Sequence, residues 1–147
     1  AYTDAYVKGD MLWIKSTFKK ALFMWILSVL GGLVMLAVCN LFYKIWVGSK
    51  VEVPLMVSLC TLVYVCFFNL NNCVTYLING LNKIFVQIIT SLAFTALYIM
   101  SVFAIGGKLG IEGIVLCMAG SYAMMSLIHL YQCWLLVNGK AKGIWNK

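Results

Sequence analysis

Four stretches of this chain contain no Asp, Glu, Lys or Arg: residues 21–43, 53–82, 84–107 and 113–139. A helix that crosses a bilayer needs about 20 predominantly apolar residues, and each stretch is long enough. Helices of a soluble domain would carry a charged face, which these stretches lack. The sequence therefore predicts an all-α membrane protein with four transmembrane helices. We place them at residues 21–43, 54–78, 84–106 and 113–137.

Composition supports the same class. The 147 residues are 64% hydrophobic and only 10% charged, with a mean hydropathy of +0.99. So few charges could not cover the apolar surface of a soluble domain of this size.

The segment before the first span, residues 10–20, predicts a short amphipathic helix. Asp10 is a suitable N-cap. Met11, Ile14 and Phe18 share one face of the helix, and lysines lie on another. This pattern is typical of a helix at the membrane interface that continues into the span.

The basic residues are all lysines, eleven in number, and they flank the apolar stretches. If both ends of the chain are cytoplasmic, eight lysines lie on the cytoplasmic side and three on the other. The positive-inside rule therefore predicts cytoplasmic termini. The same distribution favours contact with anionic membrane lipids over binding of nucleic acid.

Polar side chains form a stripe on each of three spans. The stripes comprise Asn69, Asn72, Tyr76 and Asn79 on the second, with Asn71 and Thr75 off that face; Gln87, Ser91, Thr95, Tyr98 and Ser101 on the third; and Ser121, His129 and Gln132 on the fourth. Such groups either make interhelical hydrogen bonds, worth about 0.6 kcal/mol each, or line an aqueous cavity. For the stripes together we favour the cavity. Its candidate lining residues are Asn69, Asn72, Asn79, Gln87, Ser91 and Tyr98.

His129 is the only group within the expected spans that titrates near neutral pH. It could carry protons, or it could be a hydrogen-bonded packing residue. One histidine and six cysteines without a Cys-x-x-Cys pair predict no metal site, and we expect no cofactor. No catalytic constellation can be assembled, so we do not expect an enzyme.

Three segments resemble a known family. YLINGLNKIFVQ (residues 76–87) resembles the cytoplasmic connection before the last two helices of polysaccharide flippases. The opening AYTDAYVKGDMLWIKSTFKKAL resembles the segment that follows the eighth helix of these proteins. GKLGIEGIVLCMAGSY (residues 107–122) resembles their glycine-bearing turn into the last helix. The family is that of the O-antigen and capsular polysaccharide flippases, within the multidrug/oligosaccharidyl-lipid/polysaccharide exporter superfamily.

The resemblance implies that the chain is the C-terminal part of a twelve-helix, two-lobe flippase in the bacterial inner membrane. Its partners would be lipid-linked oligosaccharide, membrane lipids and the remainder of the parent chain. Such proteins move undecaprenyl-pyrophosphate-linked oligosaccharide to the periplasmic leaflet for O-antigen, capsule or exopolysaccharide synthesis by alternating access. The family commonly holds the pyrophosphate with basic groups, whereas this chain has no arginine and carries its lysines at helix ends. That group must therefore come from the remaining chain or from Lys83, and we expect no transport by this part alone.

Two alternatives stay open. One is a drug or metabolite exporter of the same superfamily, which a membrane-embedded carboxylate would favour. The other is a complete four-helix membrane protein, either a small transporter or a structural tetraspan. Small multidrug transporters rely on an intramembrane Glu, which is absent here, and a tetraspan scaffold would not need polar stripes.

Overall fold

The computed structural model describes residues 1–46, 48 and 53–147. The described part is helical, with no β-strand, and four of its helices are long and apolar enough to cross a membrane. This confirms the predicted all-α fold. The elements are α1 (Tyr2–Val7), α2 (Met11–Trp46), α3 (Leu55–Gly80), α4 (Phe85–Ala104), the 3₁₀ turn η1 (Gly106–Lys108), α5 (Gly110–Val137) and the 3₁₀ turn η2 (Gly143–Asn146).

The predicted amphipathic segment and the first span form one continuous helix, α2. The Asp10 carboxylate accepts a hydrogen bond from the backbone N–H of Trp13 at 2.9 Å, as expected of an N-cap. Ile14 and Phe18 are buried, whereas Lys15 and Lys19 are exposed. At 1.5 Å per residue, α2 is about 54 Å long and exceeds the hydrocarbon core of about 30 Å. Its first turns therefore extend beyond the span.

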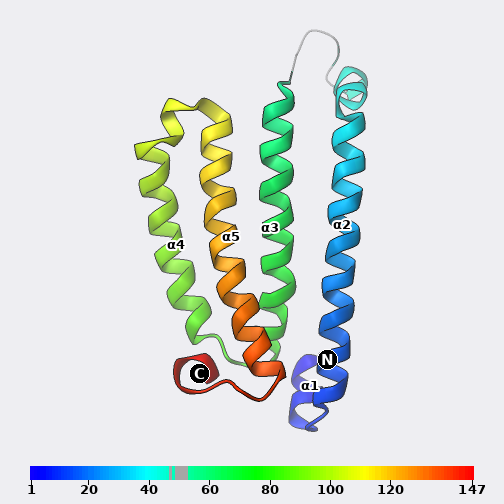
Figure 1. The fold of residues 1–147 in the computed structure, drawn as a ribbon, viewed down its shortest axis with the longest axis vertical. Coiled ribbons are helices and arrows are strands. Elements are labelled where there is room, and N and C mark those ends of the chain that lie inside the picture. The colour runs from blue at the N-terminus through cyan, green and yellow to red at the C-terminus, as the bar shows by residue number, and fades with distance from the viewer. Residues whose placement is uncertain (47, 49–52) are drawn as a thin grey trace.

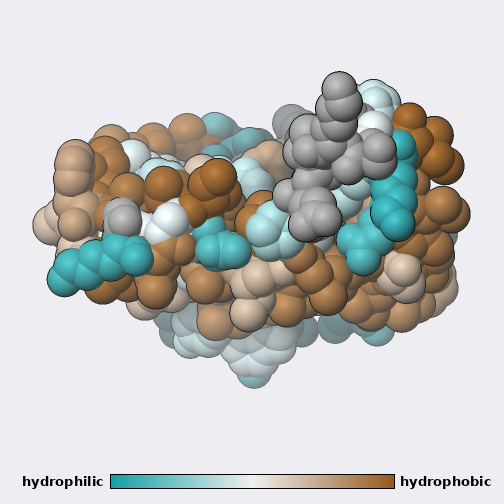
Figure 2. Space-filling model, turned by 90° about the horizontal axis from the view of Figure 1, so that it is seen from above, coloured by the Kyte–Doolittle hydropathy of each residue, from teal (hydrophilic) through white to brown (hydrophobic). Residues whose placement is uncertain are grey.

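The long helices stand side by side in the order α4, α5, α3, α2 (Figure 1). The main contacts join neighbours in this row: α4 with α5, α5 with α3, and α3 with α2. Viewed from the end that carries the α4–α5 turn, the molecule has an elongated outline with mostly hydrophobic residues along its sides (Figure 2). The four spans thus form one layer with two broad apolar faces.

Both termini lie at the same end of this layer, together with the connection between α3 and α4 (Figure 1). The largest cluster of buried apolar side chains is also near this end. It includes Ile14 of α2, Val74, Leu77 and Ile78 of α3, and Cys133 of α5, each fully buried. The apolar packing between the long helices is therefore concentrated near the termini.

At the opposite end, α4 turns into α5 through η1. A Cβ atom on Gly113 would lie 2.8 Å from the carbonyl oxygen of Gly106 and 2.5 Å from Cβ of Leu109. Gly113 therefore permits the close approach of backbone that makes this turn. In contrast, a Cβ on Gly120, two turns along α5, would meet nothing within 4 Å.

These two glycines give a matched test of the turn. Gly113→Ala should destabilise the protein by about 1–3 kcal/mol, because a backbone oxygen must move to make room. Gly120→Ala should be neutral or stabilising by up to about 1 kcal/mol, because alanine favours the helix. Thermal unfolding in lipid nanodiscs measures both. Equal effects at the two positions would show that the turn is not packed as described.

Candidate functional site

His129 of α5 is an almost completely buried polar side chain, with only 1% of its surface exposed. Its Nδ1 lies 2.9 Å from Oδ1 of Asn71 on α3. Its Nε2 lies 2.7 Å from Oγ1 of Thr90 on α4. One imidazole thus links three helices, and we call these residues the polar tie.

The partners determine where the ring hydrogen lies. An amide oxygen only accepts hydrogen bonds, so Nδ1 carries the hydrogen and donates it to Asn71. Nε2 then accepts the hydroxyl hydrogen of Thr90. The Thr90 hydroxyl can also donate to the backbone oxygen of Val86, at 2.9 Å. If Nε2 gained a proton, it could donate to Oγ1 of Thr90 while that hydroxyl turned to Val86. The tie therefore keeps a full set of hydrogen bonds in both protonation states of the ring.

Gln132 of α5, one turn nearer the termini, is fully buried. Its Nε2 donates to the backbone oxygen of Lys83, at 2.9 Å, and to that of Trp145, at 3.3 Å. Gln132 therefore joins α5 to the α3–α4 connection and to η2. Lys83 also donates from Nζ to the backbone oxygen of Asn146, at 3.1 Å. These contacts join the start of α4, the end of α5 and η2 at the end of the layer that carries the termini.

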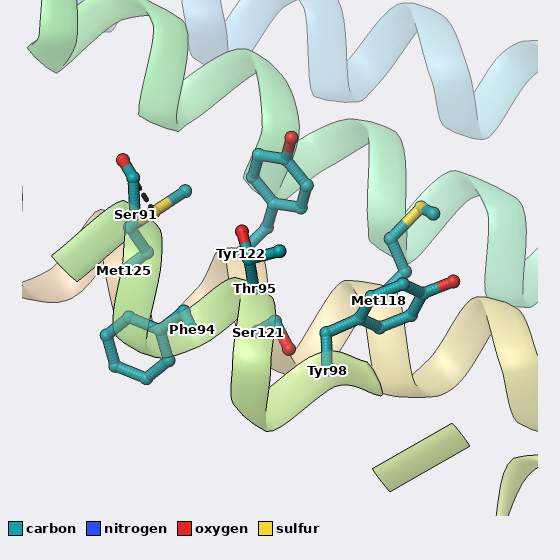
Figure 3. A pocket seen from close by; sticks show the side chains of 8 residues that line it. All are labelled: Ser91, Phe94, Thr95, Tyr98, Met118, Ser121, Tyr122 and Met125. Carbon is teal, nitrogen blue, oxygen red and sulfur yellow. Dashed lines mark hydrogen bonds between the residues drawn. The ribbon is translucent and has the colours of Figure 1, made fainter. Parts of the chain in front are cut away.

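A pocket of about 270 Å³ lies between α4 and α5, nearer to the α4–α5 turn than the polar tie is (Figure 3). Ser91 at its edge donates a hydrogen bond to the sulfur of Met125 at 3.9 Å. The pocket contains hydroxyl groups, aromatic rings and methionine side chains, but no charged group. Its lining residues are Ser91, Phe94, Thr95, Tyr98, Met118, Ser121, Tyr122 and Met125.

The candidate cavity residues do not all lie together. Ser91 and Tyr98 line the α4–α5 pocket, and Gln87 lies one turn from Thr90, beside the tie. Asn69 and Asn72 of α3 are half-buried, and Asn79 is exposed. These three asparagines are not among the pocket's lining residues. That all six line a water-filled path stays a prediction.

The helical periodicity of the polar residues does not predict two members of the polar tie. Asn71 lies off the polar face that periodicity predicts for its helix, and Thr90 does not belong to the predicted polar stripe of its helix. The face that Asn69, Asn72 and Asn79 share is real, but α5 packs against a different face of α3. The one sequence feature that indicates a role for Asn71 is its amide, because an amide within a membrane span needs a hydrogen-bond partner inside the protein.

No family model matches this chain, and comparisons with the curated proteins and with the solved structures found no match. The fold itself defines the class: four long apolar helices make this a multi-pass α-helical membrane protein.

Two adjacent asparagines test the polar tie. Asn71→Leu should destabilise the protein by about 1–3 kcal/mol, because it leaves the buried Nδ1–H of His129 without a partner. Asn72→Leu is the matched control and should change stability little, because Asn72 makes no side-chain hydrogen bond to any described residue. Unfolding in nanodiscs measures both variants. A tolerated Asn71→Leu would show that His129 does not depend on this amide.

Proposed function

We propose that this chain is part of a flippase that moves lipid-linked oligosaccharide across the bacterial inner membrane. The observation that carries the proposal is the lining of the α4–α5 pocket. Sugars present hydroxyl groups that both donate and accept hydrogen bonds, together with apolar ring faces. The pocket offers the matching groups: the hydroxyls of Ser91, Thr95, Tyr98, Ser121 and Tyr122, and three aromatic rings.

The uncharged lining suits a neutral sugar rather than a pyrophosphate, which is usually held by cations. Lys83 is the lysine of the α3–α4 connection, at the end of the layer that carries the termini. In this proposal the sugar contacts the pocket and the charged group lies nearer that end. The proposal requires no catalytic residue and no cofactor.

The single-layer arrangement supports the view that the chain works with further helices. Both faces of the layer expose large apolar side chains, as do the outer helices. In a two-lobe flippase, the remaining helices would cover one of these faces and close a cavity against it. The proposed partner is therefore the remainder of the parent chain.

One observation favours an exporter of drugs or metabolites instead. Phe94, Met118 and Met125 give the pocket a flexible apolar side, and methionine is frequent in surfaces that accept varied ligands. Competition separates the two functions. An amphipathic drug that blocks the pocket while oligosaccharide does not would favour the exporter.

Cysteine accessibility tests the flippase proposal. In a full-length parent without native cysteines, single cysteines at Ser91 and Tyr98 should react with a membrane-impermeant thiol reagent. Lipid-linked oligosaccharide should slow this labelling several-fold. Cysteines at Asn69, Asn72 and Asn79 test the wider path predicted from the sequence. A cysteine at Leu92, which is exposed on α4 at 71%, is the lipid-facing control and should not react.

Failure to label at both Ser91 and Tyr98 would exclude an aqueous pocket. Labelling that oligosaccharide does not affect would leave a pocket without this substrate and would contradict the flippase proposal.

His129 is the residue we propose for proton coupling, because its hydrogen bonds can be completed with or without a proton on Nε2. The rate of transport should then depend on pH, and His129→Ala should abolish the dependence on a proton gradient. A rate that is insensitive to pH, or full activity of His129→Ala, would contradict this role.

A further inference from the structure

Three buried side-chain oxygen atoms have no hydrogen-bond partner among the described residues. They are Oγ1 of Thr75, Oε1 of Gln87 and Oε1 of Gln132. Each belongs to a different helix: α3, α4 and α5 respectively. A buried polar atom without a partner is costly, and in a membrane no lipid group can replace the missing bond.

Each of the three residues lies three or four positions along its helix from a member of the tie. Thr75 follows Asn71 by four residues on α3, and Gln132 follows His129 by three on α5. Gln87 precedes Thr90 by three residues on α4, which runs in the opposite direction. Residues three or four apart lie on the same side of a helix, one turn from each other. All three residues are therefore one helical turn from the tie, on the side of the termini.

The orientation of Gln132 is determined by its surroundings. Its Nε2 donates to the backbone oxygens of Lys83 and Trp145, so its Oε1 must point away from them. The residue is completely buried. Oε1 of Gln132 is thus an oriented, buried acceptor that no described protein group satisfies.

We propose that an ordered water molecule occupies this junction of α3, α4 and α5. It accepts a hydrogen bond from the hydroxyl of Thr75 and donates to Oε1 of Gln87 and Oε1 of Gln132. One donor and two acceptors complement one water, and buried waters typically make about three hydrogen bonds. The water gives α4 a second polar link to α3 and α5, one turn from the link through Thr90.

The sign of a stability change tests this site. If the oxygens have no partner, Thr75→Val and Gln87→Met should be neutral or stabilising, because each removes an unsatisfied atom. If the water is bound, each should lower Tm by about 2–4 °C, and the double variant should lose less than the two single losses together. Thr61→Val is the control on α3, because the exposed Thr61 hydroxyl bonds within its own helix to the backbone oxygen of Val57.

Infrared spectroscopy tests the same site without a substitution. The unmodified protein in nanodiscs should show an O–H stretching band that shifts in water labelled with ¹⁸O. This shift distinguishes a bound water from a threonine hydroxyl, whose band would not shift. Thr75→Ser should retain the band, and Gln87→Met should lose it. Unchanged or higher Tm in both Thr75→Val and Gln87→Met, or no ¹⁸O-sensitive band, would overturn the proposal.

A bound cation is the competing occupant. Titration with sodium chloride against choline chloride at constant ionic strength distinguishes the two. A water site predicts the same Tm in both salts. Stabilisation that requires sodium, and that Gln87→Met removes, would overturn the water and assign the junction to a cation.

Discussion

The structure depends on one constraint: within lipid, each polar side chain must find its partner inside the protein. The polar tie satisfies this constraint for three helices at once. His129 has two ring nitrogens, and it uses one for Asn71 of α3 and the other for Thr90 of α4. Since α3 and α4 make few direct contacts, α5 and its histidine hold them in one unit.

The tie and the α4–α5 pocket divide the layer into two parts with different roles. Near the termini, buried apolar side chains, the tie and Gln132 hold the helices firmly together. Towards the α4–α5 turn, the space between α4 and α5 is instead an open pocket lined by hydroxyls and aromatic rings. Both properties fit the transport function proposed above, in which a binding surface is carried on helices that are packed tightly together.

The sequence predicted four helices long and apolar enough to cross a membrane, because charge is so costly in lipid that long charge-free runs indicate such helices. It also predicted the cap at Asp10, which is a local interaction. The partner of His129 could not be predicted in the same way. In a soluble helix the apolar face shows which side is buried, but both the lipid face and the packed face of α3 are apolar. Periodicity could group Asn69, Asn72 and Asn79, yet it could not show that α5 meets the face with Asn71.

The most direct test of this account is the protonation pattern of the His129 ring. The chain has a single histidine, so ¹⁵N magnetic resonance of selectively labelled protein in lipid reports on this ring alone. For the neutral ring, the account predicts hydrogen on Nδ1, donated to Asn71, with Nε2 unprotonated and accepting from Thr90. A neutral ring protonated on Nε2, or one that exchanges rapidly between both forms, would contradict the polar tie.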